Sequence, residues 1–207
     1  MSDDNGQPPA RLMQADWQHV DKPTLDDFRA ADWAVIERQR GPYMAAEQAR
    51  QALELLTASA DAPTFGYQIN NYQHCLQAAT MAMRDGRDEE TVVVALFHDL
   101  GFIVCPDTHG DFAAAFLRAY ISDANHWMLR HHAVFQQVHV LEHPNQDMDP
   151  NARERWRGHP HFDWTAEFVA KYDQNSIQAD YDTAPLETFV PMVQRLFART
   201  PRPLHED

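Results

Sequence analysis

The residues best suited to chemistry stand together in the stretch Thr91–Phe102, which reads TVVVALFHDLGF. An apolar run typical of a buried helix ends there in His98 and Asp99, an imidazole beside a carboxylate, and Gly101 then stops the helix. A buried carboxylate costs free energy unless a cation neutralises it, and a metal ion would do so. The two side chains could equally hydrogen-bond to each other under a helix end, so the dipeptide alone leaves both interpretations open.

Other polar side chains interrupt or end the apolar faces of predicted helices in the same way. One buried histidine is common, but six polar residues in one core carry a large cost unless they share a partner. Shared metal coordination removes that cost, and two ions bridged by Asp99 would use all the ligands. Imidazoles and carboxylates suit iron, manganese, cobalt or zinc. The set consists of His74, His98, Asp99, His109, His132 (or His131) and Asp173.

The helical pattern does not choose between His131 and His132. Trp127, His131 and Val134 form one plausible stripe of a predicted helix at 123–139, and the stripe that contains His132 is equally plausible. Both histidines therefore remain candidates from the sequence.

The elements that must position these ligands are all predicted to be helical. Gly86 should close the helix that carries His74, and Asp88 should cap the helix that ends at His98. A helix break is expected at Gly41–Pro42, and a surface excursion at 143–160. Because we find no alternating strand pattern, dinucleotide-type glycine loop or internal repeat, the predicted fold class is all-α, a single helical bundle. Helical periodicity covers residues 28–39, 42–59, 67–86, 109–121, 123–139, 161–176 and 185–200.

The length of 207 residues suits one domain, expected at 24–200, with a flexible N-terminal arm at 1–23 and a flexible tail at 201–207. A net charge of -14, with 31 acidic against 17 basic residues, would repel a phosphate backbone, so nucleic acid is not an expected partner. No apolar run approaches the roughly 20 residues that span a bilayer, and the acidic start does not resemble a signal peptide. We therefore expect a soluble, cytoplasmic protein without a membrane partner.

Cysteine and histidine usage also bears on the kind of site. Cys75 and Cys105 form no CxxC pair, so neither a disulfide framework nor a zinc finger is expected. Most of the 12 histidines lie between His98 and His161. This clustering favours a metal site.

The ordered set of motifs resembles the HD-domain superfamily in its dinuclear form. The closer resemblance is to its diiron oxygenase branch, which contains myo-inositol oxygenase and the phosphonate-cleaving HD-domain oxygenases. It covers roughly residues 65–185 and would make the fold a single HD-domain helical bundle with a dinuclear metal site in its core. The motifs that carry it are QHCLQAA around His74, HDLG at His98, HG at His109, RHHAVFQ at His132 and KYDQNS at Asp173.

This resemblance implies two iron ions with Asp99 as the bridge. In that branch a mixed-valent Fe2+/Fe3+ pair activates molecular oxygen, and a hydrogen atom is removed from a carbon of the substrate. The protein would then be a non-haem diiron oxygenase that oxidises or cleaves a small hydroxylated molecule. The implied ligands are His74, His98, Asp99 and Asp173 for one iron, and Asp99, His109 and His132 for the other.

Several positions depart from the branch and point to a less charged substrate. Phe102 stands where the inositol enzyme has a lysine and the phosphonate enzymes a histidine. Gln136 and Ala170 replace a lysine and an arginine of the phosphonate enzymes, and Tyr67 replaces a glutamate. The candidate pocket residues are Tyr67, Phe102, Gln136 and Ala170, together with His131 and His139, which could serve the site as acids or bases or could be solvated or capping histidines.

A second function remains open from the sequence. HD-domain proteins often hydrolyse phosphoesters, so the chain could be a phosphohydrolase that uses a hydroxide on manganese, cobalt, nickel or zinc to attack a small phosphoester or nucleotide. No cluster of lysine and arginine accompanies the ligands, however, and Arg130 and Lys171 are the only nearby candidates for holding phosphate. A third and less favoured possibility is a catalytically silent binding domain stabilised by metal.

Overall fold

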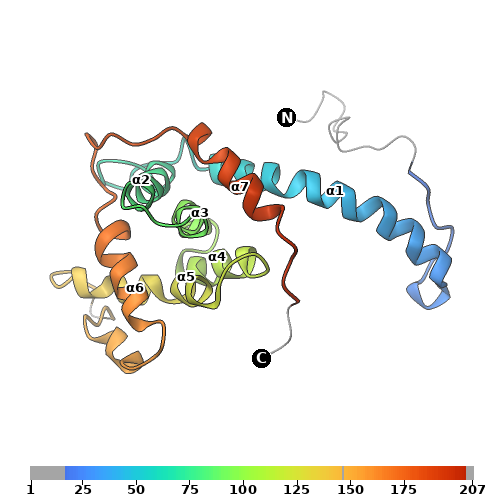
Figure 1. The fold of residues 1–207 in the computed structure, drawn as a ribbon. Coiled ribbons are helices and arrows are strands. Elements are labelled where there is room, and N and C mark those ends of the chain that lie inside the picture. Colours follow the sequence, from blue (N-terminus) through green and yellow to red (C-terminus); the bar gives the residue numbers. More distant parts are fainter. Residues whose placement is uncertain (1–16, 146, 204–207) are drawn as a thin grey trace. The chain divides into compact units, whose positions relative to one another are not determined.

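The computed structural model describes residues 17–145 and 147–203 (Figure 1). Within these residues the secondary structure consists of seven α-helices with 3-10 and π-helical segments and no β-strand, which confirms the all-α class. None of the described helices combines the length and apolar character that a bilayer span requires. The α-helices are α1 (Ala30–Thr57), α2 (Asn71–Arg84), α3 (Glu89–Phe97), α4 (His109–Leu117), α5 (Asp123–Gln136), α6 (Phe162–Phe168) and α7 (Val190–Phe197). The short segments are η2 (Leu25–Asp27), η3 (Pro106–Thr108), η4 (Gln137–His139), η5 (Ala152–Trp156), the π-helical η6 (Val169–Asp173) and η7 (Leu186–Thr188).

The chain divides into two compact units, Met1–Gln48 and Ala49–Asp207. In the first unit the ring of Trp17 contacts Tyr43 edge-on at 5.5 Å between centroids, and the backbone N–H of Gln18 donates to Gln39 Oε1 at 2.6 Å. The N-terminal arm and tail predicted at 1–23 and 201–207 lie partly outside the described residues, since 1–16 and 204–207 are not described.

The predicted helix break at Gly41–Pro42 is wrong, because α1 runs through it without interruption. A proline inside a helix removes one N–H donor and crowds the preceding turn. Gly41 and Pro42 are both exposed, so water can bond the carbonyl that loses its partner. The proline therefore does not end the helix.

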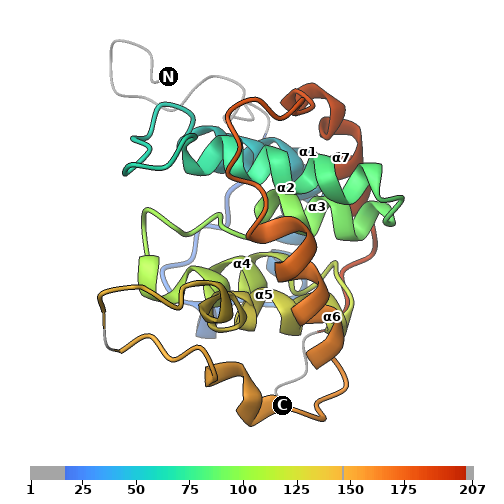
Figure 2. The same cartoon turned by 90° about the vertical axis from the view of Figure 1, so that its left-hand side faces the viewer.

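The second unit contains the hydrophobic core, which is built by packing α2 on α3 and α5 on both α4 and α6 (Figure 2). Helix α7 packs on α3, and η6, which continues α6, contacts α2 and α5. Phe97, Leu117, Phe135, Phe168 and Leu196 are fully buried in this core. Large apolar side chains thereby anchor α3, α4, α5 and α6, whereas α2 is buried through Leu76 and small residues.

The ends of α2 and α3 follow the residues that the sequence marks. Asn70 and Gln73 form a capping box at the start of α2, and Gly86, with a φ of 73°, follows its end. Asp88 caps α3 by accepting a hydrogen bond from the Thr91 N–H at 2.8 Å. The predictions at Gly86 and Asp88 are confirmed.

Helix α3 ends earlier than predicted, at Phe97, so that His98 is its C-cap and Gly101 lies in the turn beyond. The N–H of Leu100 bonds the Phe97 carbonyl at 3.1 Å in this turn. A Cβ at Gly101 would lie 2.8 Å from Cys105 Sγ and 3.1 Å from His109 Cα. Glycine is therefore required here by a close approach to the start of α4.

Candidate metal centre

The second unit brings six polar side chains together in its core, and all of them are buried. They form three overlapping groups, each with two imidazoles and one carboxylate. Within each group the potential ligand atoms lie within 4.8 Å of one another. The cluster could therefore hold a metal ion. The groups are His74, His98 and Asp99; His98, His132 and Asp173; and Asp99, His109 and His132.

Each of these residues is placed by the end or the buried face of a helix. His98 and Asp99 follow α3, and His109 is the first residue of α4. His74 and His132 lie within α2 and α5, on faces that are buried in the core. Asp173 ends the π-helical segment η6, a rare form of helix that is frequent at functional sites.

The four histidines form two pairs whose Nε2 atoms face each other. His74 Nε2 lies 2.9 Å from His98 Nε2. In the other pair, His109 Nε2 lies 3.0 Å from His132 Nε2. Two lone pairs at this distance repel, so either a proton or a metal ion must lie at each pair.

The outer nitrogen of every ring is held by a backbone carbonyl. A carbonyl oxygen only accepts hydrogen bonds, so each Nδ1 must carry the proton and donate, which leaves each neutral Nε2 with its lone pair directed into the cluster. This is the arrangement in which a histidine presents Nε2 to a metal while its other nitrogen is fixed. The Nδ1 bonds reach Ser176 at 2.9 Å, Ala95 at 2.8 Å, Pro106 at 2.6 Å and Leu129 at 2.7 Å, from His74, His98, His109 and His132 respectively.

The carboxylate of Asp99 lies between the two histidine pairs. Its Oδ1 is 3.2 Å from the Nε2 atoms of both His109 and His132, and its Oδ2 is 3.6 Å from His74 Nε2. Oδ1 therefore faces the His109–His132 pair and Oδ2 faces His74, while His98 Nε2 lies 3.8 Å from Oδ1. This division is the geometry that a bridge between two cation sites requires.

Asp173 supplies the second carboxylate and has an unpaired oxygen. Its Oδ1 lies 3.6 Å from His74 Nε2 and 3.7 Å from His98 Nε2, and it accepts a hydrogen bond from Gln136 Nε2 at 2.9 Å. Its Oδ2 is buried without a hydrogen-bond partner among the described residues. A buried carboxylate oxygen without a donor is costly, and a bound cation would satisfy it.

The electrostatics of the cluster match this chemistry. Burial lowers the pKa of His98, but the charges of Asp99 and Asp173 outweigh it and raise that pKa to about 9. Burial acts to raise the pKa of Asp99, yet the charge of His98 and the hydrogen bonds with His109 and His132 hold this pKa well below its usual range. The carboxylates are thus charged at neutral pH. Without a metal ion, a proton on the imidazoles offsets this negative charge at the place where a cation would bind.

A cavity of about 110 Å³ opens beside the cluster and is lined by both His74 and Asp99. Phe65 and Phe102 form part of its wall, with ring centroids 6.5 Å apart, and Phe102 also contacts the His109 ring edge-on at 5.8 Å. Phe65 has a φ of 53°, a strained backbone conformation for a bulky residue. Among the described residues that line this cavity none is a lysine or an arginine.

The predicted pocket residues separate into two groups. Tyr67, Phe102 and Gln136 line the cavity. His131 instead stacks on Trp127 at 4.0 Å between ring centroids, while His139 and Ala170 are exposed, and none of the three lines the cavity. The tertiary structure therefore brings His132, and not His131, to the cluster.

Sequence reasoning missed three residues that shape the site. Ser176 holds the His74 ring, and Asn71 Nδ2 donates to the backbone carbonyl of Asp99 at 3.2 Å. Phe65 is the third, and it lies in a turn whose sequence shows no helical periodicity. Only the strain at Phe65 marks it, and strain is not visible in a sequence.

A scan against models of known protein families finds no match for this chain, and a search of curated proteins also finds none. The resemblance to the HD-domain superfamily therefore stays a prediction that rests on the motifs.

Proposed function

We propose that this protein is an HD-domain metalloenzyme whose buried His/Asp cluster binds two iron ions bridged by Asp99. The observation that carries the proposal is the division of the Asp99 carboxylate, with one oxygen toward His74 and the other toward His109 and His132. Six buried ligands exceed what one ion with an open position for substrate needs. The unpaired Asp173 Oδ2 provides a further oxygen that could coordinate one of the two ions.

The iron pair, when bound, would supply the activation of molecular oxygen for oxidation of a substrate C–H bond. The chain would hold each imidazole in the required tautomer through the four backbone carbonyls, and Gln136 would keep Asp173 oriented through its hydrogen bond. Phe65 and Phe102 would exclude water from the cavity and limit the size of the molecule that enters.

The small cavity supports oxygenase chemistry over phosphoester hydrolysis. A phosphate group is usually bound by arginine or lysine, and each charge-assisted bond contributes roughly 1.5–3 kcal/mol. The cavity instead offers Asn70, Asn71, Gln136 and the Tyr67 side chain, which can bond hydroxyl groups. We therefore infer a small, uncharged, hydroxylated substrate.

Metal analysis and electron paramagnetic resonance test this proposal. Protein purified without chelator or nickel affinity resin should contain close to two irons per chain. After partial reduction it should show the signal of a coupled Fe2+/Fe3+ pair. Hydroxylated candidate substrates should perturb that signal and stimulate oxygen uptake, and His98→Ala should lose both effects.

The alternative gives a different set of results. A phosphohydrolase would turn over generic phosphomonoesters anaerobically with manganese, cobalt, nickel or zinc, and the His98→Ala variant would lose that turnover. Such activity would overturn the oxygenase assignment. His139→Ala is the matched control, because His139 is exposed and lies outside the cluster, and it should behave as the unmodified protein does in both assays.

A further inference from the structure

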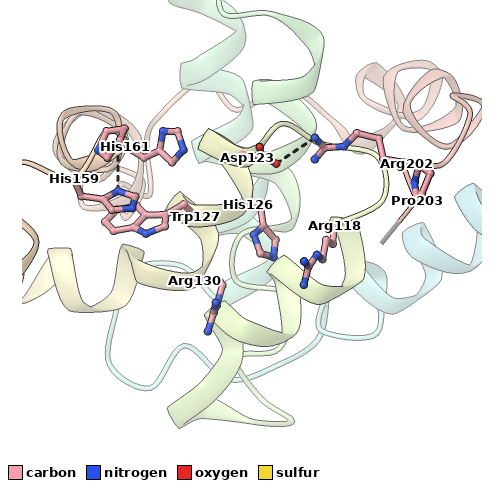
Figure 3. A pocket seen from close by; sticks show the side chains of 10 residues that line it. Arg118, Asp123, His126, Trp127, Arg130, His159, His161, Arg202 and Pro203 are labelled. Carbon is pink, nitrogen blue, oxygen red and sulfur yellow. Dashed lines mark hydrogen bonds and ion pairs between the residues drawn. The ribbon is translucent and has the colours of Figure 1, made fainter. Parts of the chain in front are cut away.

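A second and larger cavity, of about 620 Å³, lies on the second unit away from the six candidate ligands, none of which lines it. It is formed by the end of α4, the first turns of α5, the loop that contains His159 and His161, and residues 202–203 (Figure 3). Its volume falls in the range of sites for small molecules, about 300–1,000 Å³. Nothing in the proposed function uses it.

The lining of this cavity is cationic, although the chain as a whole has a net charge of -14. Arg118, Arg130 and Arg202 line it, against Asp123 as the single carboxylate among the lining residues. Three guanidinium groups gathered on so acidic a protein are not expected from composition, and they repel one another unless anions lie near.

Two of these arginines are held in place by neighbouring groups. Arg202 donates from its backbone N–H to the Ala119 carbonyl at 2.8 Å, and its Nη1 lies 3.2 Å from Asp123 Oδ1. Arg130 bonds Asp111 Oδ1 at 2.8 Å through Nε. The two terminal NH2 groups of Arg130 have no further partner among the described residues, so this guanidinium can bond a ligand.

His126 lies among these charged residues, and its pKa indicates the sign of the local electrostatic field. It precedes Arg130 by one helical turn, and Figure 3 shows its ring beside the Arg118 side chain. Burial lowers the pKa of His126, and the charges of Arg118, Arg130 and Arg202 lower it further, against the opposing effect of Asp123. The local field is therefore positive, and an anion in the cavity would be attracted to it.

An aromatic wall completes the cavity. The ring of His159 stacks on Trp127 at 4.2 Å between centroids and 14° between planes. The N–H of His161 donates to His159 Nδ1 at 3.2 Å and fixes that ring, as the dashed line in Figure 3 marks. A ligand would thus meet fixed aromatic surface on one side and guanidinium groups on the other.

We propose that this cavity binds a small phosphorylated molecule, with the phosphoryl group held by Arg118, His126 and Arg130. A phosphoryl dianion presents three oxygens and can bond several guanidinium groups at once, whereas one planar carboxylate is satisfied by a single guanidinium. The cavity volume exceeds what a free phosphate fills, so the body of the molecule lies along the wall that the stacked rings of His159 and Trp127 form. The inference does not depend on the metal centre, because the two sites share no lining residue or ligand.

Isothermal titration calorimetry at low ionic strength tests it, with glucose 6-phosphate as the probe and glucose, inorganic phosphate and citrate as comparisons. The ester should bind saturably and more tightly than inorganic phosphate, and glucose should not bind. Loss of one charge-assisted bond should weaken the binding of the ester roughly tenfold or more. The double variant Arg118→Ala/Arg130→Ala should therefore weaken this binding about 100-fold. Arg195→Ala should bind the ester as the unmodified protein does. Arg195 is an exposed arginine on α7 that pairs with Glu89 of α3 at 2.7 Å.

Further measurements keep the test decisive if the double variant unfolds. The single variants Arg118→Lys and Arg130→Lys retain charge but lose the planar fork, and each should weaken the ester several-fold. The ring resonances of His126 should shift on addition of the ester in nuclear magnetic resonance spectra, and metal content should not change in any of these variants. Binding that is equal in all arginine variants, tighter for citrate, or no tighter for the ester than for inorganic phosphate would overturn the proposal.

Discussion

Asp99 differs from the other five residues of the candidate centre because both of its oxygens are used. Its Oδ2 faces His74 and its Oδ1 faces His109 and His132, whereas His109 belongs to only one of the three groups of potential ligands. A residue shared by two cation sites should affect both when it is removed. A residue of one site should affect that site alone.

We therefore expect Asp99→Ala to lose both metal ions and His109→Ala to lose chiefly one. The measurement is the ratio of metal to protein after gel filtration, with circular dichroism to show that the variants remain folded. His139→Ala serves as the control and should keep the full ratio. Equal loss of both ions in His109→Ala would mean that the two sites are not separable in the way described.

At the scale of elements, the crossing of α4 and α5 sets the distance between His109 and His132. Gly110 lies at this crossing, where an added Cβ would be 2.6 Å from the Leu129 carbonyl oxygen and 3.4 Å from His132 Cε1. A backbone oxygen cannot rotate away as a side chain can. Any larger residue must therefore push the helices apart.

Gly110→Ala should lower the free energy of unfolding by about 1–3 kcal/mol, the usual cost of overpacking. It should also weaken metal binding at the His109–His132 pair more than at the His74–His98 pair. Urea unfolding and metal titration measure the two effects. Ala115→Gly on the exposed face of α4 is the control and should cost about 1 kcal/mol through helix propensity without changing metal content.

Glu90 connects α3 to the start of α5 and to the residues that follow α7. It lies on α3, accepts hydrogen bonds from the Ser122 N–H at 2.7 Å and Asn125 Nδ2 at 2.9 Å, and pairs with Arg199 at 2.7 Å. Partial burial acts to raise the pKa of Glu90, but these donors outweigh it and hold the pKa below the ordinary value of 4.5. The ionised carboxylate thus favours the folded state.

A group with a lowered pKa in the folded state stabilises it above the unfolded-state pKa, and this contribution is lost as the pH falls through the folded-state value. Glu90→Gln should accordingly lower the free energy of unfolding at pH 7 by about 1–2 kcal/mol. The difference from the unmodified protein should narrow below a pH of about 4.5. Denaturant unfolding across that range measures it, and Glu142→Gln, at an exposed loop position, should show no difference at any pH.

For the whole molecule, the buried cluster couples metal binding to stability. An ion that binds only the folded chain adds about 4 kcal/mol at a concentration 1,000 times its dissociation constant. Chelator should therefore lower the unfolding midpoint by about 2–4 °C for each kcal/mol lost in a chain of this size. Asp99→Ala should be insensitive to chelator, because it should lose both ions. Identical unfolding of the unmodified protein with and without metal would mean that protons alone stabilise the buried cluster.

The sequence anticipated the elements better than the distances between them. Gly86 and Asp88 mark helix ends correctly because caps and left-handed turns depend on a few adjacent residues. The helix break predicted at Pro42 was wrong, because the effect of this proline on α1 depends on whether water reaches the preceding turn. The site residues were found for a related reason, since each one interrupts an apolar pattern.

Local patterns were thus sufficient for the all-α class and for five of the six polar residues, because helical periodicity is encoded within a few turns of chain. Tertiary packing alone decided that His132 enters the cluster while His131 stacks on Trp127. It also brought Arg202 to Arg118 and His126, a grouping that no local pattern indicates. The physical reason is that proximity of residues distant in sequence depends on how helices cross, and a crossing is set by the shapes of side chains on both helices at once.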